Sequence, residues 1–195
     1  IEVGDWSSDV CSSDLKKKTT MENVIDWVVT IVMGLALYFA IDFCIGRVRV
    51  EGISMDTTFL EGQLLMVNKL NYRFNEPTRG DVVVFKSPVE PEKEYIKRLI
   101  GLPGDTIAIH ENQLYINGGA VDEPYLHEAM TYDFEEWVVP EGMYFALGDN
   151  RNHSFDSHSW GGVPRANLVG NAFFRYWPLN RIGTIGYEIA VSPSE

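Results

Sequence analysis

The uncharged run from Trp27 to Ile41 (WVVTIVMGLALYFAI) constrains this chain more than any other feature of its sequence. With the apolar residues that flank it, the run extends over residues 24–45, and Asp26 and Asp42 then lie near its two ends. About 20 apolar residues span the hydrocarbon core of a bilayer, and aspartates are tolerated only at its interfaces. The alternative is a buried core helix, which can be shorter. We interpret residues 24–45 as one transmembrane helix.

The sequence after this helix argues against its removal by cleavage. Gly46–Val50 offers no small-x-small cleavage site and runs directly into a strand-like pattern, so we expect an uncleaved signal anchor. Lys16–Lys18 precede the helix, while Arg47 and Arg49 follow it. This bias favours a cytosolic N-terminus. We therefore expect a single-pass protein of the cell membrane whose residues 46–195 are extracytoplasmic.

The first residues look foreign to the fold. Residues 1–15 (IEVGDWSSDVCSSDL) contain a near-repeat without helical or strand periodicity, and CSSDL resembles an in-frame translation of a sequencing adapter. A natural disordered tail is the alternative, and the tract is excluded from fold reasoning in either case. Residues 16–23 then form a basic cytosolic segment. Two cysteines, Cys11 and Cys44, are too few for a disulfide framework.

Short β-rich runs alternate with turn residues throughout residues 46–195. Such spacing is typical of an antiparallel sandwich or barrel, and we expect a mostly β body, an antiparallel β-sheet or barrel-like structure. His110–Gln113 predicts a tight hairpin turn, and Val82–Phe85 predicts a strand buried on both faces. The expected strands are Val48–Ile53, Leu64–Asn68, Asp81–Phe85, Glu94–Ile100, Thr106–His110, Gln113–Ile116, Tyr144–Leu147 and Asn171–Trp177.

The charge balance and the histidines exclude several classes of function. The chain has 16 basic and 28 acidic side chains and a net charge of −12, which argues against nucleic acid as a partner. Of the four histidines, only His153 and His158 are close in sequence, and they lack helical spacing. No clustered thiolates accompany them, so we do not expect a zinc site.

Two residues stand in unusual surroundings. Ser54 places a hydroxyl directly after an expected strand. Gly52, two residues earlier, has no side chain, so another molecule can approach the backbone closely there. Lys97 and Arg98 are adjacent cations on an apolar strand. Alternation alone cannot decide which of the two faces inward. A buried lysine is costly as an ammonium, so its pKa falls and it can act as a general base.

Four motifs in order resemble bacterial signal peptidase I, a membrane-bound serine endopeptidase. They are GISMDTTF, RGDVVVF, YIKRLIGLPGD and LGDNRNHSFDSHSWG, and they follow an apolar anchor as in that family. The resemblance extends from about Val24 to Gly183. It implies an antiparallel β fold like that of signal peptidase and LexA, with its active face near the membrane.

The resemblance also assigns roles to individual residues. It implies that Ser54 is the nucleophile and Lys97 the general base, a Ser-Lys dyad that needs no histidine. Ser154 matches the serine that orients the lysine. The remaining matches are structural ion-pair residues near the site, namely Arg98, Asp149 and Asp156, with His158 at the position where the family has an arginine.

Three positions depart from the family pattern. Thr57 replaces the proline of S-M-x-P-T, so the turn after the nucleophile loses a fixed φ. His158 can pair with Asp156 but titrates near neutrality. Gly52 offers no side-chain donor to an oxyanion, which would then depend on backbone N–H groups, chiefly that of Ser54.

The implied reaction is cleavage of N-terminal signal peptides from exported preproteins after small residues, Ala-x-Ala, through an acyl-enzyme. Such a reaction needs no metal or organic cofactor, so we expect none. The expected partners are those preproteins and the lipid bilayer. Two alternatives belong to other classes. A self-cleaving regulator of the LexA type would need a DNA-binding domain in place of the anchor, and a catalytically silent, membrane-tethered binding module is motivated by Thr57.

Overall fold

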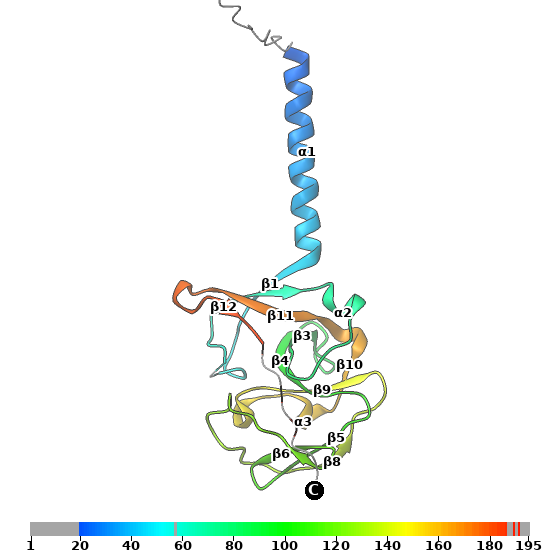
Figure 1. Ribbon diagram of the computed structural model, residues 1–195, viewed down its shortest axis with the longest axis vertical. Helices are drawn as coiled ribbons and strands as arrows, with labels where there is room; N and C mark the ends of the chain where they lie inside the picture. The colour runs from blue at the N-terminus through cyan, green and yellow to red at the C-terminus, as the bar shows by residue number, and fades with distance from the viewer. Residues whose placement is uncertain (1–19, 57, 187–188, 190, 192–195) are drawn as a thin grey trace, which may run out of the picture. The chain divides into compact units, whose positions relative to one another are not determined.

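Figure 1 shows the computed structural model, which describes residues 20–186 except 57, together with residues 189 and 191. The tract 1–15, Cys11, Lys16–Lys18 and Thr57 lie outside the described residues. Helix α1 (Thr20–Cys44) contains 25 residues, none of them buried, and its mean hydropathy reaches 2.2. By length and composition it can cross a membrane, and the predicted N-terminal apolar helix is present.

The remainder of the chain is mostly antiparallel β-sheet. The larger sheet has the strand order β1-β2-β11-β3-β4-β9-β10, with β12 paired to β11. Short helical segments lie in its connections: α2 (Asn71–Phe74), η1 (Arg151–His153), α3 (Ser157–Trp160), η2 (Arg165–Asn167) and η3 (Leu179–Arg181). The strands are β1 (Ile45–Arg49), β2 (Leu64–Asn68), β3 (Val82–Lys86), β4 (Glu94–Gly101), β9 (Met143–Leu147), β10 (Val163–Pro164), β11 (Leu168–Trp177) and β12 (Gly183–Thr184).

A second sheet has the order β7-β6-β5-β8. Its strands are β5 (Thr106–His110), β6 (Gln113–Ile116), β7 (Gly119–Ala120) and β8 (Phe134–Val138). His110 pairs with Gln113, and the two residues between them, Glu111 and Asn112, have φ angles of 49° and 66°. Positive φ at both central residues is the signature of a type I′ hairpin, so the predicted tight turn is confirmed.

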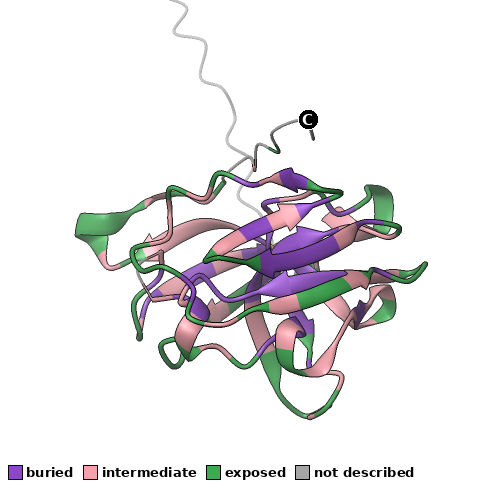
Figure 2. Ribbon diagram, turned by 90° about the horizontal axis from the view of Figure 1, so that it is seen from below, coloured by how far each residue is buried: buried purple, intermediate pink, exposed green. Residues whose placement is uncertain are grey.

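The core joins the two sheets. Ile100 and Phe145 from the larger sheet pack with Ile107 and Leu114 from the smaller one, and all four are fully buried. Figure 2 shows the buried residues gathered along the inner strands, with exposed residues mainly in the loops. Each face of the larger sheet carries a further core cluster. These clusters bury Val82–Phe85 of β3 on both faces, as this run predicts.

The predicted antiparallel β body is confirmed, and it consists of open sheets without barrel closure, because among the described strands no pairing joins β1 to β10. One feature differs from the prediction. The strand expected at Val48–Ile53 lies earlier, at Ile45–Arg49, because Arg49 pairs with Leu64 and the chain then turns away from the sheet. Ser54 therefore lies within a loop, several residues after the strand ends.

Candidate active site

Ser54 lies in the loop that leaves β1 and returns to β2. A backbone hydrogen bond from Val50 N to Gln63 O, 2.9 Å long, closes the base of this loop. Met55 and Phe59 are each 1% exposed and belong to a core cluster of the larger sheet. The loop is thus fixed at its base and by two buried side chains, and it holds Ser54 half-buried at its turn.

A second segment, the loop after β9, holds the backbone next to the serine. Asn150 N donates a 3.0 Å hydrogen bond to Ser54 O, and Asn150 Nδ2 donates a 3.1 Å bond to Ile53 O. One asparagine therefore uses its backbone and its side chain to hold two successive carbonyl groups. This fixes the direction in which the Ser54 peptide points.

Lys97 occupies the middle of β4, between β3 and β9. It is 3% exposed, and its Nζ lies 5.7 Å from the ring centroid of Tyr95. Burial disfavours the charged ammonium and lowers the pKa of Lys97 from 10.5 to about 8, although the carboxylates of Asp156 and Asp149 act in the opposite direction. Near pH 8 this lysine can therefore accept a proton.

Gly148 is the position at which these segments meet. The register of β4 and β9, continued by one residue beyond Leu147, places Lys97 beside Gly148. Directly opposed residues of antiparallel strands point to the same face. A Cβ added to Gly148 would overlap both Ser154 Oγ and the Ser54 carbonyl oxygen. The missing side chain therefore leaves the space that the Ser154 hydroxyl and the Ser54 carbonyl oxygen occupy.

The three polar groups of the expected site are not bonded to one another. Within the described residues, no hydrogen bond joins Ser54 Oγ, Lys97 Nζ and Ser154 Oγ. Ser154 Oγ is buried and has no hydrogen-bond partner. A buried hydroxyl without a partner is costly, and it is available to a group that arrives or turns toward it.

Two buried acids, Asp149 and Asp156, hold the loop that begins at Gly148. Asp149 accepts a bidentate pair from Arg98, at 2.8 Å from Nε and 2.7 Å from Nη2. Asp156 accepts the Gly148 N–H at 2.8 Å, and its other oxygen lies 2.7 Å from His158 Nδ1. The four residues placed near the site by resemblance are therefore two pairs, and His158 occupies the place opposite Asp156 that the family gives to an arginine.

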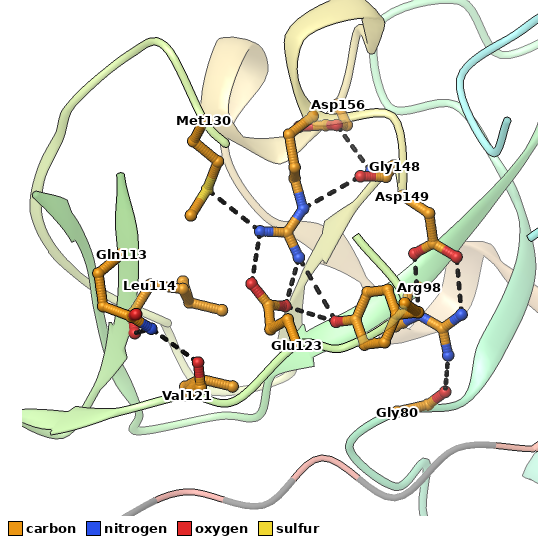
Figure 3. A network of polar contacts seen from close by, with 12 residues as sticks. Gly80, Arg98, Gln113, Leu114, Val121, Glu123, Met130, Gly148, Asp149 and Asp156 are labelled. Atoms are coloured by element: carbon orange, nitrogen blue, oxygen red, sulfur yellow. Dashed lines mark hydrogen bonds and ion pairs between the residues drawn. The ribbon is translucent and has the colours of Figure 1, made fainter. Parts of the chain in front are cut away.

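Sequence reasoning missed a third buried ion pair, between Arg151 and Glu123. Their side chains are 1% and 4% exposed, and Arg151 Nη1 donates to Glu123 Oε2 at 2.8 Å. Arg151 Nε also donates to Gly148 O at 3.1 Å. Figure 3 shows Glu123, Met130 and Gly148 in this network, which ties the segment after β7 to the loop after β9. The motif that carries Arg151 was visible in the sequence, but nothing there indicated Glu123.

A hollow of about 240 Å³ adjoins the serine loop. Its lining includes Ile53, Asp56 and Asn150, so it lies beside the Ser54 backbone that Asn150 holds. Neither Ser54 nor Lys97 is among its lining residues. Among the described residues, no group of three or more His, Cys, Asp or Glu side chains could hold a metal ion. A lysine with a lowered pKa beside a serine loop is an arrangement for acyl transfer.

A family model and several curated relatives, all of them signal peptidases, match this chain. The family model described as signal peptidase, peptidase S26, matches residues 24–177. A probable signal peptidase I-2 of Synechocystis sp. is 38% identical over 178 residues, covering 87% of this chain and 81% of the relative. A signal peptidase I of Bacillus licheniformis is 39% identical over 180 residues, covering 86% and 96%. The crystal structure of a signal peptidase I from Enterococcus faecalis V583 is 40% identical and covers 50% of this chain and 97% of its own, with a TM-score of 0.46.

Proposed function

The chain belongs to the signal peptidase family, peptidase S26, and we propose that Ser54 is its nucleophile and Lys97 its general base. It is a serine endopeptidase that cleaves signal peptides. The observation that carries the assignment is the burial of Lys97, which lowers its pKa to about 8 on the strand face where Gly148 admits both serines. A free lysine with an ordinary pKa of about 10.4 would be almost fully protonated at pH 8.

The proposed reaction follows from these two groups. The neutral Lys97 amine accepts the Ser54 hydroxyl proton while Oγ bonds to the scissile carbonyl carbon. The Ser54 N–H stabilises the resulting oxyanion. When the C–N bond breaks, the Lys97 ammonium gives its proton to the leaving amine, and an acyl-enzyme remains. Lys97 then takes a proton from water, the hydroxide attacks the acyl carbon, and the proton returns to Ser54 Oγ.

Ser154 is proposed to orient the lysine. Its Oγ is buried beside Gly148 and has no partner in the described part of the chain, so it is available to accept a hydrogen bond from the Lys97 ammonium. Such a bond would form after proton transfer, when the buried charge most needs an acceptor. Asp149 and Asp156 are positioning residues, because they hold the loop that carries Gly148 and Ser154.

The substrate is proposed to be the extended segment that ends a signal peptide, with small residues of the Ala-x-Ala type before the cut. Extended peptides bind to proteins by adding a strand to an exposed edge. We place the peptidase part outside the cytoplasm of a single-pass membrane protein, since Lys16–Lys18 precede the apolar helix. The preproteins and the bilayer are then its partners.

The peptidase domain is proposed to comprise residues 46–195, with the anchor at 24–45. Residues 41–195 form one compact unit, and β1 begins at Ile45, so the deletion that best tests this organisation leaves β1 intact. A chain that starts at Ile41 should fold, as judged by circular dichroism, and should cleave a soluble peptide with added detergent. An unfolded product would contradict the proposed domain organisation.

The decisive experiment uses the full chain in detergent with a preprotein that carries an Ala-x-Ala site. Ser54→Ala and Lys97→Arg should each abolish the mature product, because arginine cannot deprotonate in a protein. Lys93→Arg is the matched control, since Lys93 is an exposed lysine outside the site. Cleavage by purified Lys97→Arg would overturn the dyad. A wild-type chain that yields no product would support the silent module, whereas cleavage between separate molecules disfavours the self-cleaving regulator.

A further inference from the structure

A basic hollow lies on the larger sheet, away from the residues assigned to catalysis. It has a volume of about 640 Å³ and is lined by Lys69, Arg73 and Arg165, with Tyr72, Leu168 and Val169 among the rest. None of its lining residues is acidic. In a chain with a net charge of −12, three cations around one hollow are a marked departure from the average surface.

Two of these cations have no carboxylate partner among the described residues. Lys69 Nζ donates only to the carbonyl oxygen of Asp42, at 3.2 Å. The Arg73 guanidinium lies 4.9 Å above the Phe43 ring. Arg165 is held in place by Glu76 and by the hydroxyl of Tyr144 at 3.0 Å. The hollow therefore keeps an excess of positive charge.

The contacts of the hollow fix its level relative to a bilayer. Asp42 and Phe43, which Lys69 and Arg73 contact, belong to the last turn of α1, and Lys69 N donates to Cys44 O at 3.0 Å. The uncharged run ends at Ile41, so a helix that crosses the membrane brings these residues to the headgroup region. This step depends on the membrane-spanning role of α1 and not on the Ser54–Lys97 dyad.

We propose that the basic hollow binds the phosphate group of an anionic phospholipid. Arginine and lysine are the residues that bind phosphate oxygens, with arginine able to do so through two parallel N–H groups. Leu168 and Val169 give the hollow an apolar side suited to the glycerol and first methylenes of a lipid. A headgroup that carries its own cation, such as choline, loses part of this attraction.

The test is native mass spectrometry of the full chain in a non-ionic detergent, titrated separately with phosphatidylglycerol, phosphatidylcholine and inorganic phosphate. Lys69→Gln/Arg73→Gln should weaken phosphatidylglycerol binding by about thirtyfold, the effect of two cations near an anionic lipid surface. Lys86→Gln/Lys93→Gln changes the net charge equally at lysines that do not line the hollow, and it should bind as the wild type does. Lys69→Arg/Arg73→Lys keeps both charges and should retain binding.

Peptide cleavage is measured on the same samples and should be unchanged in all three variants, so that loss of lipid binding is separate from loss of the proposed function. Equal weakening in the hollow and control variants would overturn the proposal, because it would show general electrostatic attraction only. Phosphatidylcholine or inorganic phosphate binding as tightly as phosphatidylglycerol would overturn it as well. Tight binding of phosphatidylcholine would show that the site does not select an anionic headgroup. Tight binding of inorganic phosphate would show that it is a site for free anions.

Discussion

The burial of Lys97 should set the pH dependence of cleavage. Its pKa lies at about 8 in the folded chain instead of 10.5, which corresponds to a difference of about 3 kcal/mol between its two protonation states. Only the neutral amine can accept the Ser54 proton. We therefore expect kcat/KM for an Ala-x-Ala peptide to level off above pH 8 and to fall about tenfold per unit well below it.

The free energy of unfolding should also rise with pH. Between pH 8 and 10.5 the unfolded chain keeps a proton on this lysine that the folded chain has released, so the free energy of unfolding rises with pH across this window. Below pH 8 the folded state holds a buried ammonium and the full destabilisation is present. Chemical denaturation of the wild type and of Lys97→Met at several pH values measures this contribution, which the variant should lack.

A charge variant gives the sharpest form of the test. The Asp156 carboxylate raises the pKa of Lys97, so Asp156→Asn should shift the limb of the pH profile to lower pH. Asparagine keeps an oxygen that can accept the Gly148 N–H, and Asp122→Asn at an exposed position is the control. Two results would refute the assignment of Lys97 as the base: a kcat/KM that still rises near pH 10 in the wild type, or a rise that moves to higher pH in Asp156→Asn.

Three further changes test the surroundings of the site. Glu123→Gln should destabilise the chain by about 3–5 kcal/mol in a denaturant titration, because it leaves the Arg151 charge buried and uncompensated, and unchanged stability would show that the pair is dispensable. Gly148→Ala should lower kcat without unfolding the chain, since a Cβ would displace Ser154, and full activity would disprove this packing. Thr57→Pro should leave kcat unchanged or raise it by fixing φ after the nucleophile, whereas a loss above about tenfold would show a different loop conformation from that of the family.

The sequence predicts most strands because their alternation and turn residues are local signals. The orientation of Lys97 is not local. Around these residues β4 is covered on both faces, and Lys97 and Arg98 are only 3% and 2% exposed. The alternation of polar and apolar residues along the strand therefore cannot show which of the two cations points toward the site. Only the resemblance to the family gives the two residues different expected roles, and their surroundings differ as well. Arg98 meets Asp149, while Lys97 meets no carboxylate directly.

Other parts of the fold could not be read from the sequence for a different physical reason. Strand β8 (FEEWV) carries two adjacent glutamates and lies at the edge of its sheet, where the strand pattern is weakest. Glu123 lies in an irregular segment, and its partner Arg151 is 28 residues away. Only the tertiary structure brings the two charges together, so no local sequence pattern predicts this ion pair.

The hydrogen bond between Asn150 and Ile53 joins residues 97 positions apart in the chain. Contacts over such separations require closure of long loops, and they slow folding and form late. The serine loop, the lysine strand and the loop after β9 consequently come together only when both sheets have assembled. The arrangement proposed for catalysis thus exists only in the assembled fold: a chain whose two sheets have not yet formed has Ser54 and Lys97 but not the site in which they are proposed to act.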